Sequence, residues 1–544
     1  MNELYQQWYN SDRITDLERV ELKNLTEQEI AAYFKNEKLH FGTAGIRARL
    51  GLGTQKLNRF TYGQIFHAFA KYIKLNIFRS VPVIIIGHDN RYLSKKMTVL
   101  AAKILNSYGI KAILFPHNML IPTPIISYAV HELRTDGAIN ITASHNPKDD
   151  NGVKLYNLLA AQVCDEIPEI EKYFCEVKDI INLPNEELPL TNIKYLKFDI
   201  IKRYFADAKN VVLNTVELHN NQKLHKIVLN TNQGTASKLL PHFLRQIGFR
   251  IKPVRKQQII RSDFNHTKDS NPENIASFEQ AFAYADKINS KICIGVDPDA
   301  DRMAVAIKKH GKWNLLDGNQ TGTILTYYIL NNRHFINQPF VVASYVTTNI
   351  VDRIAAHFGA NVFRTGTGFK NLGKKVIEKS ATGSLAIAFE ESIGALVSNI
   401  DCDKDSFTAS ALILEIFTLY QKRHMDLLDL LNDEIYPHFG YNYTKSVSFV
   451  IKDLNWKTVL DNKINQLKQY QAPTIGKWPI EHIIWNDDGQ CLEWHLANDA
   501  WVKFRVSGTE PKFKAYFCLY GESVVDAYNK YNDLLQSVSQ LING

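Results

Sequence analysis

A serine that could carry a phosphate group follows a predicted buried strand. The apolar run Gly137–Ile141 ends just before the segment Thr142–Pro147, which reads Thr-Ala-Ser-His-Asn-Pro. Ser144 could act there as a nucleophile or a phosphate carrier, with His145 beside it and Lys154 ten residues further on. A plain Asn-Pro turn that caps a helix is the alternative. No G-x-S-x-G sequence surrounds the serine, which argues against a hydrolase triad.

Three aspartates alternate with other residues between two further apolar runs. Asp297, Asp299 and Asp301 lie between the runs 292–296 and 303–307. Carboxylates at every second position can direct single oxygens to one hard cation, which suits Mg²⁺. An acidic surface turn is the alternative, but three negative charges between buried strands are costly without a counter-ion. The pattern therefore predicts a metal site, and it lacks the glycine and glutamate of an EF-hand loop.

A carboxylate and a hydroxyl that could bind a sugar follow another apolar run. Glu390 and Ser392 come directly after the run 384–388. Their spacing suits hydrogen bonds to two neighbouring sugar hydroxyls. The alternative is an exposed helix N-terminus, where Ser and Glu are common.

A fourth segment combines the groups that bind phosphate. Arg505 supplies a bidentate fork, and the hydroxyls of Ser507 and Thr509 with the backbone N–H groups around Gly508 can surround phosphate oxygens. Lys514 follows closely. A surface turn is the alternative for this segment.

The elements that must position these segments repeat three times along the chain. Each repeat reads apolar strand, polar loop, helix, glycine and second strand, which is a βαβ unit. The repeats lie at 83–115, 227–249 and 340–363. Their continuous apolar runs are typical of strands that are buried on both faces. The sequence therefore predicts three similar α/β domains.

The last hundred residues have a different pattern. Short β-type runs alternate with two helical stretches, 456–471 and 523–542, and the runs lie at 445–451, 491–496, 501–506 and 514–519. This pattern predicts a smaller α+β domain. We expect four domains, at 1–208, 209–311, 312–435 and 436–544, which carry the serine, aspartate, Glu390 and Arg505 segments in that order.

Composition excludes several classes of protein. The chain has 544 residues, 45 % of them apolar, and 64 Lys+Arg against 56 Asp+Glu give a net charge of +8. The cations are scattered, which argues against nucleic-acid binding. No apolar run approaches the ~18 residues of a membrane helix, and six cysteines without a C-x-x-C pair suggest a reducing compartment. We expect a soluble, cytoplasmic protein with neither a membrane nor a nucleic-acid partner.

Together the four segments resemble the α-D-phosphohexomutase superfamily, in its phosphoglucomutase and phosphopentomutase branch. The combination of Thr-Ala-Ser-His-Asn-Pro, Asp-Pro-Asp-Ala-Asp-Arg and Arg-Val-Ser-Gly-Thr-Glu-Pro carries the resemblance. Two further segments, 41–47 and 87–91, are similar to family segments, so the resemblance covers 41–516. It implies three α/β domains and a fourth α+β domain with an antiparallel sheet around one central cleft.

The resemblance also implies a role for individual residues. Ser144 would be phosphorylated and donate its phosphate, and Asp297, Asp299 and Asp301 would hold Mg²⁺ that also touches the Ser144 phosphate. Around the reacting phosphate we expect Thr43, Arg47, His145, Lys154 and Arg302. The substrate would be bound by Thr367, Gly368, Glu390, Ser392, Lys404, Arg505, Ser507, Gly508, Thr509 and Lys514.

The implied reaction moves phosphate between C1 and C6 of a hexose phosphate, glucose 1-phosphate and glucose 6-phosphate, in two halves. Phosphoserine first makes a bisphosphorylated sugar of the glucose 1,6-bisphosphate type, which then turns over and returns a phosphate to Ser144. Mannose phosphates and pentose phosphates are alternative substrates, and a monomer or dimer is expected. A sugar-phosphate-binding regulator without catalysis and a Mg²⁺-dependent phosphatase are the competing functions.

Departures from the family leave two roles open. Ile393-Gly394-Ala395 stands where many relatives have Gly-His, so the general base is among Lys154, His145 and Lys404. Gln233-Gly234-Thr235 stands where relatives often have His-Gly, so the role of that loop is unassigned.

Overall fold

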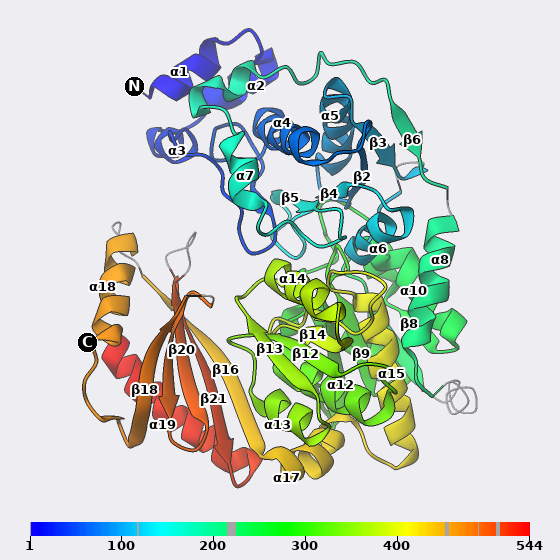
Figure 1. Ribbon diagram of the computed structural model, residues 1–544, viewed down its shortest axis with the longest axis vertical. Coiled ribbons are helices and arrows are strands. Elements are labelled where there is room, and N and C mark those ends of the chain that lie inside the picture. Colours follow the sequence, from blue (N-terminus) through cyan, green and yellow to red (C-terminus); the bar gives the residue numbers. More distant parts are fainter. Residues whose placement is uncertain are drawn as a thin grey trace. The chain divides into compact units, whose positions relative to one another are not determined.

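The computed structural model describes residues 2–116, 119–197, 199–214, 225–451, 456–487, 489–506 and 512–543 (Figure 1). It forms two compact units. The first comprises Met1–Leu316, Val376–Glu378 and Gly394–Glu415, and the second comprises Asp317–Lys375, Lys379–Ile393 and Ile416–Gly544. The architecture is three α/β/α domains followed by a C-terminal domain built on an antiparallel sheet.

The first sheet has the strand order β1-β5-β4-β2-β3-β6. Its strands β4, β2, β3 and β6 are parallel, whereas β5 is antiparallel to both β4 and β1. The strands are β1 (Ile46–Arg49), β2 (Val83–His88), β3 (Lys111–Leu114), β4 (Gly137–Ile141), β5 (Asp150–Tyr156) and β6 (Ile193–Tyr195). The accompanying helices are α4 (Arg59–Asn76), α5 (Ser94–Ser107), α6 (Thr123–Leu133), α7 (Ile167–Lys172) and α8 (Asp199–Ala208).

Three short helices precede this sheet: α1 (Glu3–Asn10), α2 (Asp16–Lys23) and α3 (Glu27–Tyr33). The last two begin with capping boxes, in which Thr15 pairs with Glu18 and Thr26 with Glu29. Each box satisfies backbone N–H groups that have no partner inside the helix. These helices were not predicted from the sequence.

The second sheet has the order β11-β10-β9-β7-β8. Its elements are β7 (Lys226–Asn230), α10 (Ala236–Ile247), β8 (Arg250–Pro253), α11 (Glu279–Ile288), β9 (Ile292–Val296), β10 (Met303–Lys309) and β11 (Lys312–Leu315). Strands β9 and β10 are antiparallel neighbours, and the loop that joins them holds the three aspartates. Both strands are buried over most of their length, so the carboxylates sit at the end of an apolar hairpin.

In the second unit, β12 (Pro339–Ser344) lies between the parallel strands β13 (Asn361–Thr365) and β14 (Ser384–Phe389). The helices of this region are α12 (Gly318–Asn332), α13 (Ile350–His357) and α14 (Phe369–Ser380). All three predicted repeats are therefore present. Their glycines Gly109, Gly248 and Gly359 have φ values of +72°, +111° and +68°, which suit residues that follow or end a helix.

Beyond β14 come β15 (Ala395–Leu396), α15 (Ser406–Lys422), α16 (Leu427–Asp429) and α17 (Tyr436–Phe439).

The C-terminal sheet is antiparallel, with the order β16-β21-β20-β19-β18-β17. Its elements are β16 (Tyr441–Val450), α18 (Trp456–Lys468), β17 (Thr474–Ile475), β18 (Trp478–Asn486), β19 (Cys491–Leu496), β20 (Ala500–Val506), β21 (Lys512–Gly521) and α19 (Val524–Asn543). The four predicted strands are present. Strand β18 was missed because a proline and a glutamate interrupt its apolar residues and only Trp478 in it is buried.

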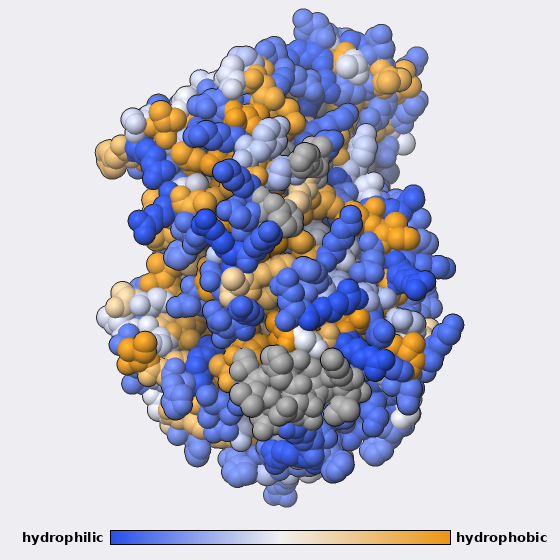
Figure 2. All heavy atoms as spheres, turned by 90° about the vertical axis from the view of Figure 1, so that its right-hand side faces the viewer, coloured by the Kyte–Doolittle hydropathy of each residue, from blue (hydrophilic) through white to orange (hydrophobic). Residues whose placement is uncertain are grey.

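Hydrophobic residues on the molecular surface are interspersed with hydrophilic ones on the face that Figure 2 shows. Among the described residues, no helix combines the length and the apolar character that crossing a bilayer requires.

The loop after β7 supports the aspartate loop by direct backbone contact. Thr235 donates its backbone N–H (2.7 Å) and its hydroxyl (3.0 Å) to the carbonyl oxygen of Pro298. A Cβ atom on Gly234 would lie 2.3 Å from both the Cα and the carbonyl oxygen of Pro298. Only glycine fits here, and this contact gives the Gln233-Gly234-Thr235 segment a structural role that its sequence left open.

Gly234→Ala should therefore displace the aspartate loop. Because the new methyl group meets backbone atoms that cannot move aside, we expect a loss of about 1–3 kcal/mol of stability and a larger loss of activity. Thermal unfolding and steady-state kinetics of the purified variant measure both effects. Gly311→Asn is the control, since Gly311 has φ +78°, which asparagine tolerates, and no heavy atom within 4 Å of its Cβ position. Equal behaviour of the two variants would contradict the assigned contact.

Candidate functional site

Ser144 lies in a strained loop at the carboxyl end of β4. Its φ is +51°, a left-handed conformation that is uncommon for serine, and its side chain is buried. Its backbone N–H donates to the Thr142 hydroxyl at 2.9 Å. Its own hydroxyl donates to Asp297 Oδ2 at 2.5 Å and lies 3.3 Å from His145 Nδ1. The loop is a turn that leads into β5, so the predicted alternative of a helix cap is wrong.

Arg91 holds this loop in place. Its guanidinium donates to four carbonyl oxygens: Ser144 (2.6 Å), Asn146 (2.6 Å), Pro147 (2.7 Å) and Asp150 (2.9 Å). The Arg91 side chain is fully buried, and Asp89 lies 3.2 Å from its Nε. A planar group with five donors can fix several carbonyls at once, which explains how the strained turn is maintained.

The three aspartates converge. Asp297, Asp299 and Asp301 are each at most 1 % exposed, and one oxygen from each lies within 4.8 Å of the others. The predicted alternative of an exposed acidic turn is therefore wrong. Ala300, between them, has φ +60°, and this left-handed residue turns the alternating carboxylates inward.

Lys154 is the principal counter-charge of the aspartates. It lies on β5, fully buried, and its ammonium donates to Asp299 Oδ2 at 2.7 Å and to Asp301 Oδ2 at 2.6 Å. Lys404 lies 3.2 Å from the same Asp301 oxygen. Thr123, at the start of α6, donates its hydroxyl to Asp299 Oδ2 at 3.0 Å and its backbone N–H to the Asp299 carbonyl at 2.8 Å.

Burial and charge act in opposite directions on these groups. Burial, strengthened by the other two carboxylates, raises the pKa of Asp297 well above its usual value. Burial also opposes ionisation of Asp301, but Lys154 and Lys404 outweigh it and hold the pKa of Asp301 well below its usual value. Burial disfavours the charge of Lys154, yet Asp299 and Asp301 raise its pKa. Lys154 is therefore a protonated counter-ion in this arrangement.

Two carboxylate oxygens stay unsatisfied within this cluster. Asp299 Oδ1 and Asp301 Oδ1 are buried and have no hydrogen-bond partner. An unpaired buried acceptor is costly, and the cost disappears if a cation binds it. Hard oxygen donors of this kind are the ligands of Mg²⁺, so the residues present fit a divalent metal ion.

Further cations surround the serine and the aspartates. Arg47 donates to the Asn146 side chain at 2.9 Å, and Arg302 Nε lies 3.8 Å from Asp301 Oδ1. Burial, together with Arg302 and Arg47, lowers the pKa of His145 well below its usual value. The structure thus brings together Arg47, Ser144, His145, Lys154, Arg302 and Lys404 with the three aspartates. Thr43 is exposed in the segment before β1.

The second unit contains the predicted sugar-binding residues. Glu390 is 6 % exposed and accepts a 2.9 Å hydrogen bond from the backbone N–H of Gly368, the residue before α14. Ser392 and Thr367 are half-buried. Glu390 follows β14 in a turn, so the predicted alternative of an exposed helix N-terminus is wrong.

Two cations face each other on the C-terminal sheet. Arg505 on β20 is paired in register with Lys514 on β21, and both side chains are half-buried. Directly opposite residues of antiparallel strands share one face of the sheet. The predicted phosphate ligands Ser507, Gly508 and Thr509 lie outside the described residues.

Sequence reasoning missed Arg91 and Thr123 as site residues. Arg91 was recognised only as part of a segment similar to the family, and its position after the end of β2 was the available signal. Nothing in the sequence around Thr123 indicated a site residue, because Asp299, which it contacts, lies 176 residues away in the chain.

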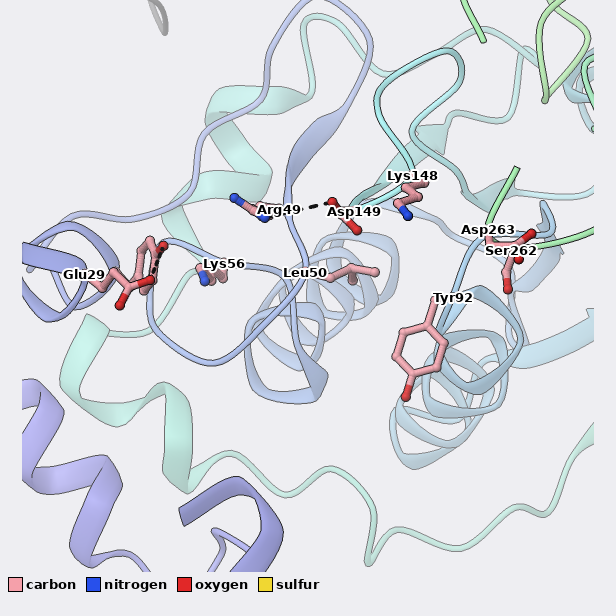
Figure 3. Close-up of a pocket in the computed structure, with 10 residues that line it drawn as sticks. Glu29, Arg49, Leu50, Lys56, Tyr92, Lys148, Asp149, Ser262 and Asp263 are labelled. Carbon is pink, nitrogen blue, oxygen red and sulfur yellow. Dashed lines mark hydrogen bonds and ion pairs between the residues drawn. The ribbon is translucent and has the colours of Figure 1, made fainter. Parts of the chain in front are cut away.

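A pocket of about 470 Å³ lies beside the serine loop (Figure 3). Lys148 and Asp149 come from that loop, and Arg49 from β1. Its cations Arg49, Lys56 and Lys148 are matched by three acids, and Arg49 lies 3.9 Å from Asp149. The acids in this pocket are Glu29, Asp149 and Asp263. The pocket is therefore balanced in charge.

Comparison with known proteins gives consistent matches along the chain. Three family models match, described as phosphoglucomutase/phosphomannomutase, alpha/beta/alpha domain I (residues 38–179), domain II (202–311) and domain III (317–436). A phosphomannomutase of Mycoplasmoides pirum is 37 % identical over 546 residues, covering 100 % of this chain and 99 % of the relative. A phosphoglucomutase of Staphylococcus haemolyticus is 29 % identical and covers 89 % of this chain and 90 % of its own.

Solved structures share the fold. A putative phosphomannomutase from Thermus thermophilus has a TM-score of 0.71 at 20 % identity, with 94 % of this chain and 100 % of the other covered. The phosphoglucomutase parafusin from Paramecium has a TM-score of 0.70 at 16 % identity, with 93 % and 97 % covered. The three family models together match most of the chain, and the relatives match over nearly its whole length. The chain belongs to the phosphoglucomutase/phosphomannomutase family of the α-D-phosphohexomutase superfamily and is a phosphohexomutase, an isomerase.

Proposed function

We propose that this enzyme interconverts the 1-phosphate and 6-phosphate of a hexose by way of a phosphate carried on Ser144. The observation that supports this most directly is the position of Ser144 Oγ, 2.5 Å from Asp297 in a buried group of three carboxylates. A serine held beside a metal-binding group is suited to accept and donate a phosphoryl group.

Asp297, Asp299 and Asp301 would hold Mg²⁺ through the oxygens described above. When bound, the ion neutralises charge on the transferring phosphoryl group. The ion also favours the ionised form of all three carboxylates, including Asp297, whose pKa is otherwise raised.

In the first half-reaction the bond between Ser144 Oγ and phosphorus would break and a bond from phosphorus to a sugar hydroxyl oxygen would form. The sugar hydroxyl would give up its proton and Ser144 Oγ would gain one, so that the serine ends as a free hydroxyl. His145 Nδ1, 3.3 Å from Ser144 Oγ, can hydrogen-bond the departing oxygen. Arg47 and Arg302 are placed to stabilise negative charge, with Thr43 as a further residue of this region. Lys154 and Lys404 are already ion-paired, so we assign them to charge balance and not to proton abstraction.

The second unit would bind the rest of the substrate. Glu390 and Ser392 suit sugar hydroxyls, with Thr367 and Gly368 beside them. Arg505 and Lys514, with Ser507, Gly508 and Thr509, would anchor the phosphate that does not react. Because the sugar bisphosphate intermediate must bind by either end, this anchor should recognise phosphate more than one face of the ring.

Glucose phosphates are our proposed substrates, with glucose 1,6-bisphosphate as the intermediate and activator. Relatives named phosphomannomutase make mannose phosphates the principal alternative. A relative named probable phosphoribomutase, 27 % identical, makes pentose phosphates a further alternative substrate.

We further propose a cytoplasmic location, in agreement with six cysteines that are all free. A regulator without catalysis is disfavoured, because the serine, the aspartates and Lys154 are assembled.

Ser144→Ala removes the proposed phosphate carrier. We expect turnover of glucose 1-phosphate, assayed with a trace of the bisphosphate, to fall at least about 10³-fold. Intact-mass analysis should show a phosphorylated fraction in the wild type that is absent from the variant. Ser127→Ala, which removes a buried hydroxyl of α6, controls for the loss of a serine. Near-normal turnover in Ser144→Ala would overturn the assignment.

Rates on three sugar 1-phosphates separate the substrate alternatives. We expect glucose 1-phosphate to have the highest kcat/KM, mannose 1-phosphate to react, and ribose 1-phosphate to react least. Net release of inorganic phosphate without isomer formation would instead indicate a phosphatase.

Mg²⁺ should stabilise the folded enzyme independently of turnover. A ligand that binds only the folded state adds about 2.7 kcal/mol at 100 times its Kd, so Tm should rise when Mg²⁺ is added to EDTA-treated protein. In Asp299→Asn the rise should be much smaller, because a buried metal ligand loses its charge. Asp12→Asn, at an exposed position, should behave as the wild type. Equal rises in the wild type and Asp299→Asn would contradict the metal site.

A further inference from the structure

A long irregular segment of the second α/β domain contacts the serine loop of the first. It runs from residue 259 to residue 274, between the 3₁₀ helices η4 (Arg255–Gln258) and η5 (Ile275–Phe278), and the structure describes all of it as turns and bends without helix or strand. We call it the bridging loop. Irregular connections of more than about 12–15 residues are uncommon in compact domains, and many of them serve a function. The reaction proposed above gives this loop no role.

Ser270 connects the bridging loop to the serine loop. Its hydroxyl donates to the carbonyl oxygen of His145 at 2.7 Å and lies 3.4 Å from that of Asn146. Arg91 donates to the carbonyl oxygens on either side of His145, those of Ser144 and Asn146, each at 2.6 Å. Three consecutive carbonyl oxygens of the serine loop are therefore held by side chains from distant parts of the chain, and Ser270 holds the middle one.

This hydrogen bond acts at the residue next to the reacting serine. A peptide group that is held at its carbonyl oxygen is restricted in rotation, so Ser270 fixes the backbone direction at His145. The imidazole Nδ1 of His145 lies 3.3 Å from Ser144 Oγ. Ser144 has the left-handed φ of +51°, and such a conformation persists only where its surroundings over-determine it. Ser270 is thus placed to act on Ser144 through the backbone, without touching the substrate.

The bridging loop also contacts two cations near the serine and the aspartates. The side chain of Phe264 is buried, and its ring centroid lies 5.3 Å from the guanidinium carbon of Arg91. Glu273 lies 3.7 Å from Arg302 Nη1. An aromatic face and a carboxylate both attract a guanidinium group electrostatically. The loop therefore meets the serine loop directly through Ser270 and indirectly through Arg91, and it meets the aspartate loop through Arg302.

Gln233 fixes the bridging loop in its turn. Its side-chain nitrogen donates to the carbonyl oxygen of Ile259 at 2.8 Å, and its side-chain oxygen accepts from the backbone N–H of His266 at 2.8 Å. Asn90, in the segment after β2, donates to the carbonyl oxygen of Arg261 at 2.7 Å. These bonds attach the first half of the loop to the segments that follow β7 and β2. Ser270 therefore extends from a supported backbone.

We propose that Ser270 is a positioning residue of the phosphohexomutase reaction, which orients the backbone at His145 and so aligns Ser144 and His145 for phosphoryl transfer. The inference rests on the proposed role of Ser144 as the phosphate carrier. Ser270 keeps its proton throughout and forms no bond to phosphorus. Transfer requires the attacking and departing oxygens to be in line with phosphorus, and a misplacement of ~1 Å can lower a rate ~10²-fold. Loss of the Ser270 hydroxyl should therefore slow transfer more than it weakens binding, since the proposed sugar and phosphate ligands lie in the second unit.

Ser270→Ala tests the proposal. The full-length wild type and the variant are first phosphorylated with glucose 1,6-bisphosphate and then mixed with Mg²⁺ and the sugar 1-phosphate that the wild type converts fastest. Intact-mass analysis of quenched samples gives the rate at which the phosphate leaves Ser144. We expect this rate and the steady-state kcat to fall about tenfold in Ser270→Ala, while KM changes less than about twofold. Tm should stay near that of the wild type.

Two further variants separate positioning from a general effect of the substitution. Ser270→Thr keeps the hydroxyl and should retain most of the wild-type transfer rate. Ser262→Ala removes a hydroxyl from an exposed position of the same loop, which Figure 3 labels, and should behave as the wild type does.

The outcomes distinguish this inference from the proposed function. Equal transfer rates in the wild type and Ser270→Ala would overturn this inference alone, and so would an equal loss of rate in Ser270→Ala and Ser270→Thr. A lower Tm with an unchanged kcat would assign Ser270 to stability and would also overturn it. Failure to detect any phosphorylated serine in the wild type would overturn the proposed function and this inference together.

Discussion

Burial of three carboxylates at one point is the constraint on which the first unit depends. Asp297, Asp299 and Asp301 are removed from water at the end of an apolar hairpin, and their mutual repulsion would be prohibitive without counter-charge. Lys154 supplies that charge from β5, and Lys404 supplies more from the segment before α15. Two carboxylate oxygens still have no hydrogen-bond partner, so the residues present fit a cation that would supply the rest of the compensation.

Rigidity around this group comes from backbone contacts. Arg91 donates hydrogen bonds to four carbonyl oxygens of the serine loop. In the aspartate loop, Pro298 accepts a hydrogen bond from Thr235 and packs closely against the backbone of Gly234. Ser144 in the serine loop and Ala300 in the aspartate loop keep left-handed conformations. Strain of this kind is maintained only where the surroundings over-determine the conformation. Such rigidity would let the proposed site stabilise charge without rearrangement during transfer.

The fold could be predicted wherever strands are buried on both faces. Continuous apolar runs followed by helices and glycines marked β2, β7 and β12, because burial on both faces leaves a strand no room for polar residues. The same reasoning failed for β18, in which only Trp478 is buried and which carries Pro479 and Glu481. It also missed α1, α2 and α3, although α2 and α3 begin with capping boxes.

The sequence by itself determined which chemical groups are present and that the serine, aspartate and Glu390 segments each follow a buried strand. The alternating aspartates, the Ser-His loop and the Arg505 segment were sufficient for the family and for the expectation of a metal. Tertiary structure alone decided how the charges balance. As a lysine, Lys154 was a candidate general base in the sequence. Its ion pairs with Asp299 and Asp301, about 145 residues away in the chain, instead favour its charged form and the role of a counter-ion. Whether a lysine is a base or a counter-ion depends on such long-range neighbours, because they set its pKa.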